Sequence, residues 1–244
     1  MSASGCLVAA PTYAGKEYAL DAWIEGYKAL TYQPRWCYQV DNTVTGLQYF
    51  ETLKRKGLKC SHVVPWTDAT MEKTFHRCWE LILEEAEREN AYWVYSVEAD
   101  NVPAPESLEM MIELALYGKV HLVTHDYPMH QSAVEASGMR GDEFYYTELG
   151  CMLMSRQLLE RAMMIYDEFH NIPLSIFNAC ERYHGGHMKL TAAFEVKHLD
   201  GYDMEFSQFA PLPDDAPGFC PTPTVPENYG TILPPSLRDS LAVS

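Results

Sequence analysis

The chain has 244 residues, a net charge of −16 and 47% hydrophobic residues, which is the composition of a globular protein with a sizeable core. The acidic balance argues against general electrostatic binding to nucleic acid or anionic membranes, because the field of the whole molecule would repel phosphates. No apolar run approaches the roughly 18 residues of a membrane span, and no signal peptide is recognisable, so we expect a cytoplasmic protein. The seven cysteines form no C-x-x-C pair and are predicted to be reduced thiols.

Short apolar segments alternate with segments of helical periodicity along most of the chain, as in α/β proteins. Strands are expected at 6–10, 36–40, 60–65, 92–97, 120–124, 150–154 and, more weakly, 188–197. Helices are expected at about 17–30, from 47 to Gly57, at 71–86, after Pro105, after an N-cap at Ser155, and at about 175–183. The pattern predicts a mostly parallel central sheet flanked by helices, in a single domain at 1–209. A proline-rich, extended tail is expected at 210–244.

Polar residues follow most of the expected strands. In an open α/β sheet the ligand crevice lies beyond the carboxyl ends of the strands, where loops and helix N-termini converge. The segments at these ends are Pro11-Thr12-Tyr13, Asp41-Asn42, Glu98-Ala99-Asp100, His125-Asp126 and His198-Leu199-Asp200. Such a cluster of acids and imidazoles suits a hard divalent cation, and that cation suits a diphosphate.

Each of these residues also has a structural interpretation. About five acid-x-acid triplets are expected by chance in so acidic a chain, so Glu98 and Asp100 gain weight only from following the most strand-like segment. Asp41-Asn42 could be a strand-ending Asx turn, and His198 a half-buried histidine bonded to a carbonyl. Lys73 and Arg77, one turn apart on an expected helix, could reach a diphosphate or could be surface charges.

The order of these segments resembles that of the GT-A fold glycosyltransferases that use nucleotide-diphospho-sugars, and within them the family-2-like group. The resemblance covers about residues 5–200. It is carried by 8–13, Val40-Asp41-Asn42, 95–103, 148–156 and Val196-Lys197-His198.

The resemblance implies roles for individual residues. Residues Pro11, Thr12, Tyr13, Asp41 and Asn42 would hold the nucleoside of the donor, for which a UDP-sugar is favoured. Glu98 and Asp100 would take the place of the family's Asp-x-Asp motif, with Glu98 near the ribose or the metal. Asp100 and His198 would bind Mn²⁺ or Mg²⁺, which neutralises the leaving diphosphate.

The sequence departs from the family pattern at the general base. Inverting members usually carry an acid just ahead of the helix expected near Ser175, whereas 174–178 contains no carboxylate. Inversion needs a base beside the acceptor hydroxyl, and Asp126 or Glu148 could supply it. A retaining enzyme or a catalytically inactive protein is the alternative.

The leading hypothesis is therefore a metal-dependent glycosyltransferase with an unidentified acceptor. A saccharide or glycan precursor fits the acidic surface better than the rival acceptor, a hydroxylated base of viral DNA, which would need a basic groove. The other hypotheses are a non-catalytic nucleotide- or glycan-binding module and a nucleotidyltransferase. A nucleotidyltransferase should carry a Gly-rich basic loop after the first strand. The segment Ala14-Gly15-Lys16 resembles such a loop only weakly.

Overall fold

The first expected strand becomes β1 (Cys6–Thr12), which pairs in parallel with β2 (Trp36–Asp41) and with β4 (Trp93–Val97). The computed structural model describes residues 5–63, 71–125, 150–184, 188–190 and 196–199, all within one compact unit. The mostly parallel sheet expected from the sequence is confirmed.

Seven strands of the described residues form one sheet, in the order β3-β2-β1-β4-β7-β6-β8. The remaining strands of this sheet are β3 (Lys59–His62), β6 (Leu122–His125), β7 (Cys151–Ser155) and β8 (Met188–Leu190). Strand β7 is antiparallel to both of its neighbours, whereas every other described pair in the sheet is parallel. The carboxyl ends of β1, β2, β3 and β4 therefore lie at the same edge.

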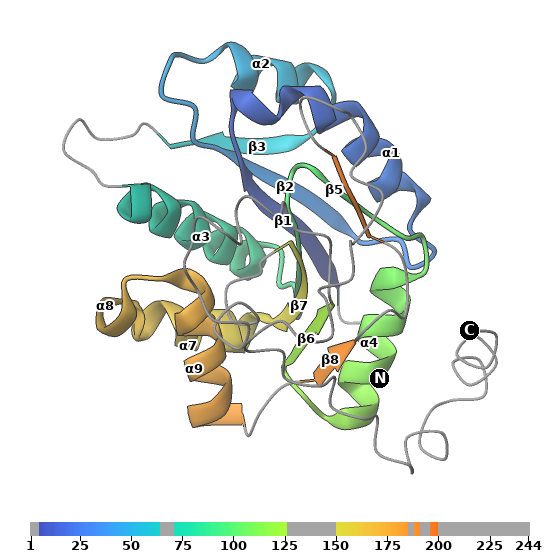
Figure 1. Ribbon diagram of the computed structural model, residues 1–244, viewed down its shortest axis with the longest axis vertical. Helices are drawn as coiled ribbons and strands as arrows, with labels where there is room; N and C mark the ends of the chain where they lie inside the picture. The colour runs from blue at the N-terminus through green and yellow to red at the C-terminus, as the bar shows by residue number, and fades with distance from the viewer. Residues whose placement is uncertain (1–4, 64–70, 126–149, 185–187, 191–195, 200–244) are drawn as a thin grey trace, which may run out of the picture. The chain divides into compact units, whose positions relative to one another are not determined.

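Helices cover both faces of this sheet, as Figure 1 shows. They are η1 (Ala14–Ala19, a 3₁₀ helix), α1 (Leu20–Ala29), α2 (Gln48–Arg55), α3 (Met71–Arg88), α4 (Ser107–Gly118), α7 (Arg156–Met164), α8 (Tyr166–Phe169) and α9 (Ile172–His184). In Figure 1, α3, α7 and α9 lie on one side of the sheet, and α1, α2 and α4 on the other. Among the described helices, none is long and apolar enough to cross a bilayer.

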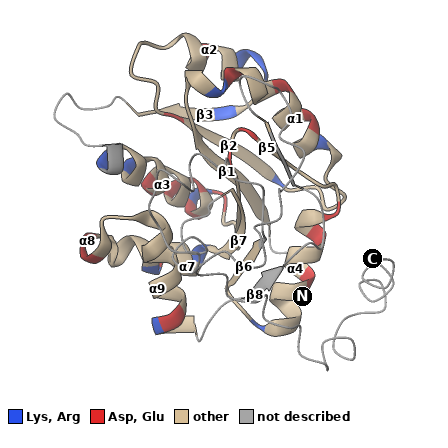
Figure 2. Ribbon diagram, viewed as in Figure 1, with Lys and Arg blue, Asp and Glu red and all other residues tan. Residues whose placement is uncertain are grey.

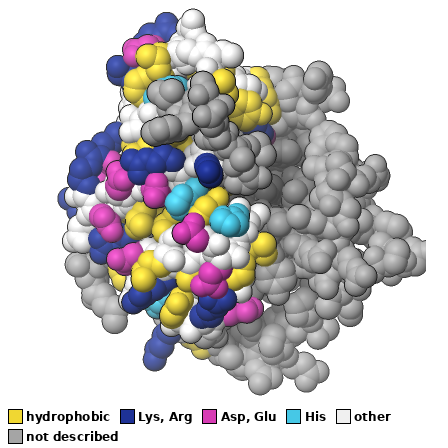
Figure 3. Space-filling view, turned by 90° about the vertical axis from the view of Figure 1, so that its left-hand side faces the viewer, with side chains coloured by type: hydrophobic (Ala, Val, Ile, Leu, Met, Phe, Trp, Pro, Cys, Tyr) yellow, Lys and Arg dark blue, Asp and Glu magenta, His cyan; other side chains and the backbone are white. Residues whose placement is uncertain are grey.

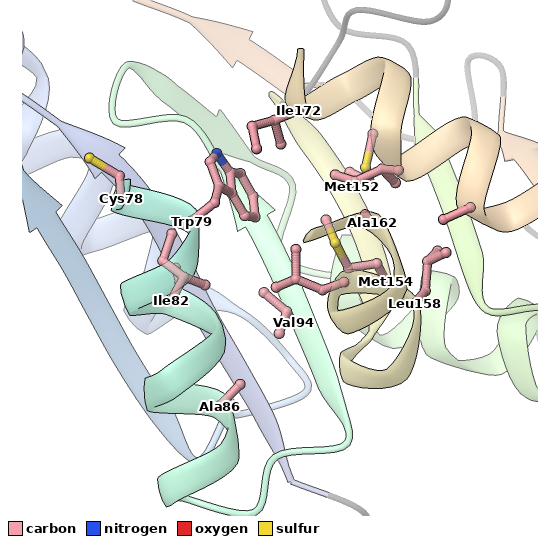
Figure 4. Packing of buried hydrophobic residues seen from close by; sticks show 14 of the residues in the cluster. Cys78, Trp79, Ile82, Ala86, Val94, Met152, Met154, Leu158, Ala162 and Ile172 are labelled. Carbon is pink, nitrogen blue, oxygen red and sulfur yellow. The ribbon is translucent and has the colours of Figure 1, made fainter. Parts of the chain in front are cut away.

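A hydrophobic core cluster joins α3, α7 and α9 to the sheet. Trp79 and Ile82 of α3 are fully buried, and they pack with Val94 of β4 and with Leu158 of α7. Figure 4 shows the Trp79 ring pointing away from the α3 axis toward Ile172. Burying a large apolar side chain contributes roughly 1.5–3 kcal/mol, so this layer holds the three helices against the strands.

Two helix ends follow the expected chemistry. Gly57 has a φ of +80° after α2, and the N–H of Leu58 returns to the carbonyl of Leu53, which is the arrangement in which glycine ends a helix. The Ser155 side chain accepts a hydrogen bond from the backbone N–H of Leu158, which confirms the expected N-cap of α7.

Other expectations need correction. The expected helix at 17–30 begins as the 3₁₀ helix η1, and α9 begins earlier than expected, at Ile172. The single weak strand expected at 188–197 is two short strands: β8 joins the main sheet, and β9 (Val196–His198) pairs with the unexpected β5 (Asn101–Pro103) in a second, two-stranded sheet. Three-residue strands are too short to show periodicity in the sequence, so their presence depends on the strands with which they pair.

The described cysteines are free thiols, as expected, and four of the six are buried. Burial raises the pKa of Cys37 and that of Cys78 to about 12, so these thiols stay protonated at neutral pH. The tail expected at 210–244 lies outside the described residues.

Candidate functional site

The ends of β1 and β2 are tied together by hydrogen bonds just beyond the sheet. The Asn42 backbone N–H donates to the carbonyl of Thr12 at 2.9 Å, and the Ala14 N–H donates to the Thr43 hydroxyl at 2.8 Å. Two of the segments predicted to form the crevice, Pro11-Thr12-Tyr13 and Asp41-Asn42, are therefore neighbours.

Asp41 is fully buried at the centre of this junction. Its Oδ1 accepts from both the backbone N–H and the hydroxyl of Thr43, at 2.9 and 2.5 Å, and its Oδ2 lies 2.9 Å from Nδ1 of His62. The contact with the Thr43 N–H is an Asx turn, the structural interpretation left open from the sequence. Asp41 thus joins the end of β2 to β3 through His62 and, through Thr43, to Ala14 after β1. Its contact with a nucleoside stays a prediction.

The neighbouring side chains build a polar floor and an exposed aromatic rim. The Thr12 hydroxyl is 3.0 Å from the buried hydroxyl of Tyr49, and burial raises the pKa of Tyr49 to about 12. Asn42 donates through Nδ2 to Sγ of Cys78 on α3, at 3.8 Å. Tyr13, by contrast, is 47% exposed. Its ring is accessible for stacking, as a nucleobase would require.

Asp100 is the buried acid of the segment after β4. Its side chain is 2% exposed, and its Oδ2 accepts a hydrogen bond from the ammonium of Lys16 on η1. Burial tends to lower the pKa of Lys16, but the hydrogen bond and charge of Asp100, together with the charge of Glu98, outweigh it and raise that pKa. Lys16 is therefore a cation wherever Asp100 is an anion.

The segment from Glu98 to Asn101 is anchored to Gly150, the residue before β7. The Glu98 backbone N–H donates to the Gly150 carbonyl at 3.3 Å, and Nδ2 of Asn101 donates to the same oxygen at 3.2 Å. Glu98 itself is partly exposed. The two acids thus have different environments, one buried and paired with an ammonium, the other reachable from solvent.

The segment carrying His198 lies beside the segment carrying Asp100. Asn101 is paired with His198 in the antiparallel β5–β9 ladder, and the Leu199 N–H donates to the Asp100 carbonyl at 2.8 Å. The Tyr18 hydroxyl of η1 donates to the Leu199 carbonyl at 3.0 Å. The expected meeting of these two distant segments is present in the backbone, and metal binding by His198 stays a prediction.

Lys73 and Arg77 are both exposed on α3. Arg77 forms ion pairs with Glu80 at 3.0 Å and Glu84 at 2.9 Å on the same helix. These contacts favour the surface-charge interpretation of Arg77, and its predicted contact with a diphosphate stays a prediction. Asp126 and Glu148, the candidate general bases, lie outside the described residues.

Charge is distributed unevenly between the sheet and its surroundings. Figure 2 shows basic and acidic residues along the helices, whereas the central strands are mostly uncharged. On the described part of the face in Figure 3, side chains of both signs are intermixed. The buried carboxylates of Asp41, at the end of β2, and of Asp100, in the turn after β4, are therefore exceptions at the sheet.

A divalent cation fits the donor chemistry of this segment. Carboxylate oxygens are the ligands that Mn²⁺ and Mg²⁺ prefer, and the ammonium on Asp100 shows that this carboxylate attracts a cation. Among the described side chains, no three metal-binding groups converge. A complete ligand set would have to include further groups, and the candidate is His198, whose backbone segment lies beside that of Asp100.

At the level of sequence, no family model and no curated protein matches this chain. In structure, however, it has the GT-A fold of the nucleotide-sugar glycosyltransferases, which confirms the fold implied by the resemblance. The family-2-like placement remains a prediction.

Several solved structures share this fold. TarS 1–349 from S. aureus in complex with UDP matches with a TM-score of 0.53 at 14% identity, over 78% of this chain and 60% of that one. Glucosyl-3-phosphoglycerate synthase from Mycobacterium tuberculosis, in complex with Mn²⁺ and UDP-glucose, matches with a TM-score of 0.51 at 12% identity, over 86% and 73%. The chain spans 36% to 60% of the TarS chains that it matches.

Three residues of the site were not singled out from the sequence as site residues. Lys16, Thr43 and His62 bind the acids Asp100 and Asp41. Only Lys16 carried a signal, as the basic residue of Ala14-Gly15-Lys16 directly after β1. The pairing of Lys16 with Asp100 could not be predicted from the sequence, because Asp100 belongs to a distant segment.

Proposed function

We propose that this protein is a metal-dependent glycosyltransferase that transfers a sugar from a nucleotide-diphosphate donor, with a UDP-sugar favoured. The observation that carries the proposal is the meeting of Asp100 with the His198 segment at the carboxyl edge of a GT-A sheet. The solved neighbours of this fold include complexes with UDP and with Mn²⁺ and UDP-glucose, which supports the same ligand class here.

The nucleoside would occupy the junction of β1 and β2. The exposed Tyr13 ring offers a surface for stacking, and Thr12 and Asn42 lie within the same hydrogen-bonded junction. Asp41 keeps that junction rigid through Thr43 and His62. A preformed junction reduces the ordering cost of binding, which is how a small polar site gains affinity.

The diphosphate would lie toward Asp100. Glu98, Asp100 and His198 would hold Mn²⁺ or Mg²⁺, and the bound metal would neutralise the charge that develops on the leaving diphosphate. Asp100 is suited to a fixed ligand because its carboxylate is buried, while the partly exposed Glu98 can contact the metal or the ribose. Lys73 and Arg77 remain candidates for the outer phosphate.

Of the two candidate bases, Glu148 is favoured over Asp126. Gly150, two residues after Glu148 in the sequence, accepts hydrogen bonds from both Glu98 and Asn101, so Gly150 is anchored to the acidic segment. A general base must reach the acceptor hydroxyl, and the closeness of Glu148 in sequence to Gly150 is the reason for preferring it. We infer a saccharide acceptor, because the net charge of −16 disfavours nucleic acid, including a hydroxylated base in viral DNA.

A ligand panel tests the proposal. The melting temperature would be measured with UDP, GDP and ADP, each with Mn²⁺, Mg²⁺ or EDTA. UDP with Mn²⁺ at about 100 times its dissociation constant should add roughly 2.7 kcal/mol, a shift of a few degrees. The absence of a shift with every nucleotide would refute the proposal.

A second measurement separates catalysis from binding alone. Release of UDP from UDP-glucose, with water or added saccharides as acceptor, should depend on Mn²⁺ and should be lost in Glu148→Gln. That variant should keep the thermal shift with UDP and Mn²⁺, because it changes only the base. A shift without any turnover, across a broad set of donors and acceptors, would instead indicate a non-catalytic binding module.

A further inference from the structure

The 3₁₀ helix η1 contacts three separate parts of the site. Its first residue, Ala14, donates to Thr43 at the end of β2, and Tyr18 donates to the Leu199 carbonyl beside β9. Between these two anchors, the Lys16 side chain reaches Asp100. The backbone of η1 is therefore held independently of the Lys16 ammonium.

The contact of Lys16 with Asp100 involves one of the two carboxylate oxygens through which a cation would bind. The ammonium sits on Oδ2 of Asp100, a carboxylate whose side chain is 2% exposed. Two cations cannot share one buried carboxylate oxygen without strong repulsion, since screening by water is weak there. A metal ion that binds this oxygen must first displace Lys16.

Displacement of Lys16 is structurally feasible. The Lys16 side chain is 27% exposed, so the ammonium has a route to solvent, and its flexible four-carbon stem allows it to swing away. Ala14 and Tyr18 keep η1 in place during that movement. The rest of the site need not change when the ammonium leaves.

We propose that Lys16 is a built-in competitor of the divalent cation: its ammonium occupies Asp100 in the metal-free protein and must leave before the metal binds. The inference rests on the proposed function, because it takes Asp100 as a metal ligand. It assigns Lys16 a role in setting metal affinity. Metal loading therefore becomes an exchange of one cation for another, with Asp100 paired to a cation before and after it.

Binding of Mn²⁺ in the absence of nucleotide tests the exchange. The free-ion electron paramagnetic resonance signal would give the dissociation constant for the wild type and for Lys16→Met. The variant should bind Mn²⁺ about tenfold more tightly. A neighbouring cation weakens proton binding by a carboxylate by roughly one to three pKa units, and tenfold is the lower end of that range. Asp100→Asn should abolish Mn²⁺ binding at this site both in the wild type and in Lys16→Met. Any Mn²⁺ that still binds is then bound elsewhere.

A matched control is Lys56→Met, which also removes one lysine paired with an aspartate, because Lys56 lies 2.6 Å from Asp21 on the exposed surface. Its Mn²⁺ affinity should equal that of the wild type. If Lys16→Met does not fold, Lys16→Gln carries the same comparison, because it is neutral but keeps a hydrogen-bond donor.

Folded variants that bind Mn²⁺ no more tightly than the wild type would overturn the inference, as would a gain that survives Asp100→Asn. Failure of the proposed function gives a different result: no nucleotide would stabilise the protein, whatever the outcome with Mn²⁺ alone. Because the exchange is measured without nucleotide, the two failures are distinguishable.

Discussion

Asn101 is paired with His198 in the β5–β9 ladder, which places the acidic segment after β4 against the last strand of the described chain. The Leu199 N–H, bonded to the Asp100 carbonyl at 2.8 Å, extends this contact by one residue. The candidate metal site therefore depends on how well β5 is held against the rest of the fold.

Gly26 of α1 provides a first test of that dependence. A Cβ at this position would lie 2.7 Å from Cγ1 of Val102, in the middle of β5, so Gly26→Ala should displace β5 or α1. We expect a loss of about 1–3 kcal/mol in the free energy of unfolding, as for other overpacked sites. Chemical denaturation gives the value, and the double variant Gly26→Ala with Val102→Ala should recover part of it. Strict additivity of the two changes would argue against this contact.

Asp100→Asn should have two separable effects. It should remove the Mn²⁺-dependent part of the thermal shift with UDP, because the buried ligand is lost. It should also lower the stability of the metal-free protein by about 1–3 kcal/mol, since Lys16 loses its charged hydrogen-bond partner. Thermal melting with and without Mn²⁺ measures both effects. Asp21→Asn, in an exposed ion pair, is the control and should change neither.

Asp41→Ala should destabilise the junction of β1, β2 and β3. It leaves His62 and Thr43 without their buried acceptor, which costs roughly 1–3 kcal/mol for an unsatisfied group. Urea unfolding measures the loss, and Thr43→Val, which removes one hydroxyl and keeps the shape, should cost less. An Asp41→Ala variant as stable as the wild type would show that this network does not hold the strands.

Stability should fall in mild acid because of two neighbouring histidines whose rings lie in contact. The rings of His121 and His184 lie 3.9 Å apart between centroids, and burial lowers both pKa values below the ordinary 6.5; for His184 the charges of His121 and Arg161 add to the effect. A lowered pKa means that the unfolded chain takes up protons first, so the stability present above pH 6.5 is lost as the pH falls below it.

The measurement is the free energy of unfolding from pH 8 to pH 5 for the wild type and for His184→Phe, which keeps an aromatic ring at this position without a titrating nitrogen. The variant should lose less stability below pH 6.5, and the two curves should run parallel above pH 7. Parallel curves over the whole range would contradict this assignment.

Much of the fold could be predicted from the sequence because its signals are local. The long apolar period of α3, the aromatic and β-branched residues of β4, and the glycine after α2 each specify an element without reference to distant residues. The position of Glu98 and Asp100 after β4 likewise indicated the edge of the sheet where ligands bind.

The contacts that complete the site are long-range, and only the folded structure decided them. Strands β5 and β9 have three residues each and exist because they pair with one another. The sequence by itself determined which residues end the parallel strands, because hydrophobic periodicity and turn-forming residues depend only on neighbouring positions in the chain. The tertiary structure decided that Lys16 binds Asp100 and that His198 lies opposite Asn101, because burial of charge and strand pairing depend on partners brought together by the packed sheet.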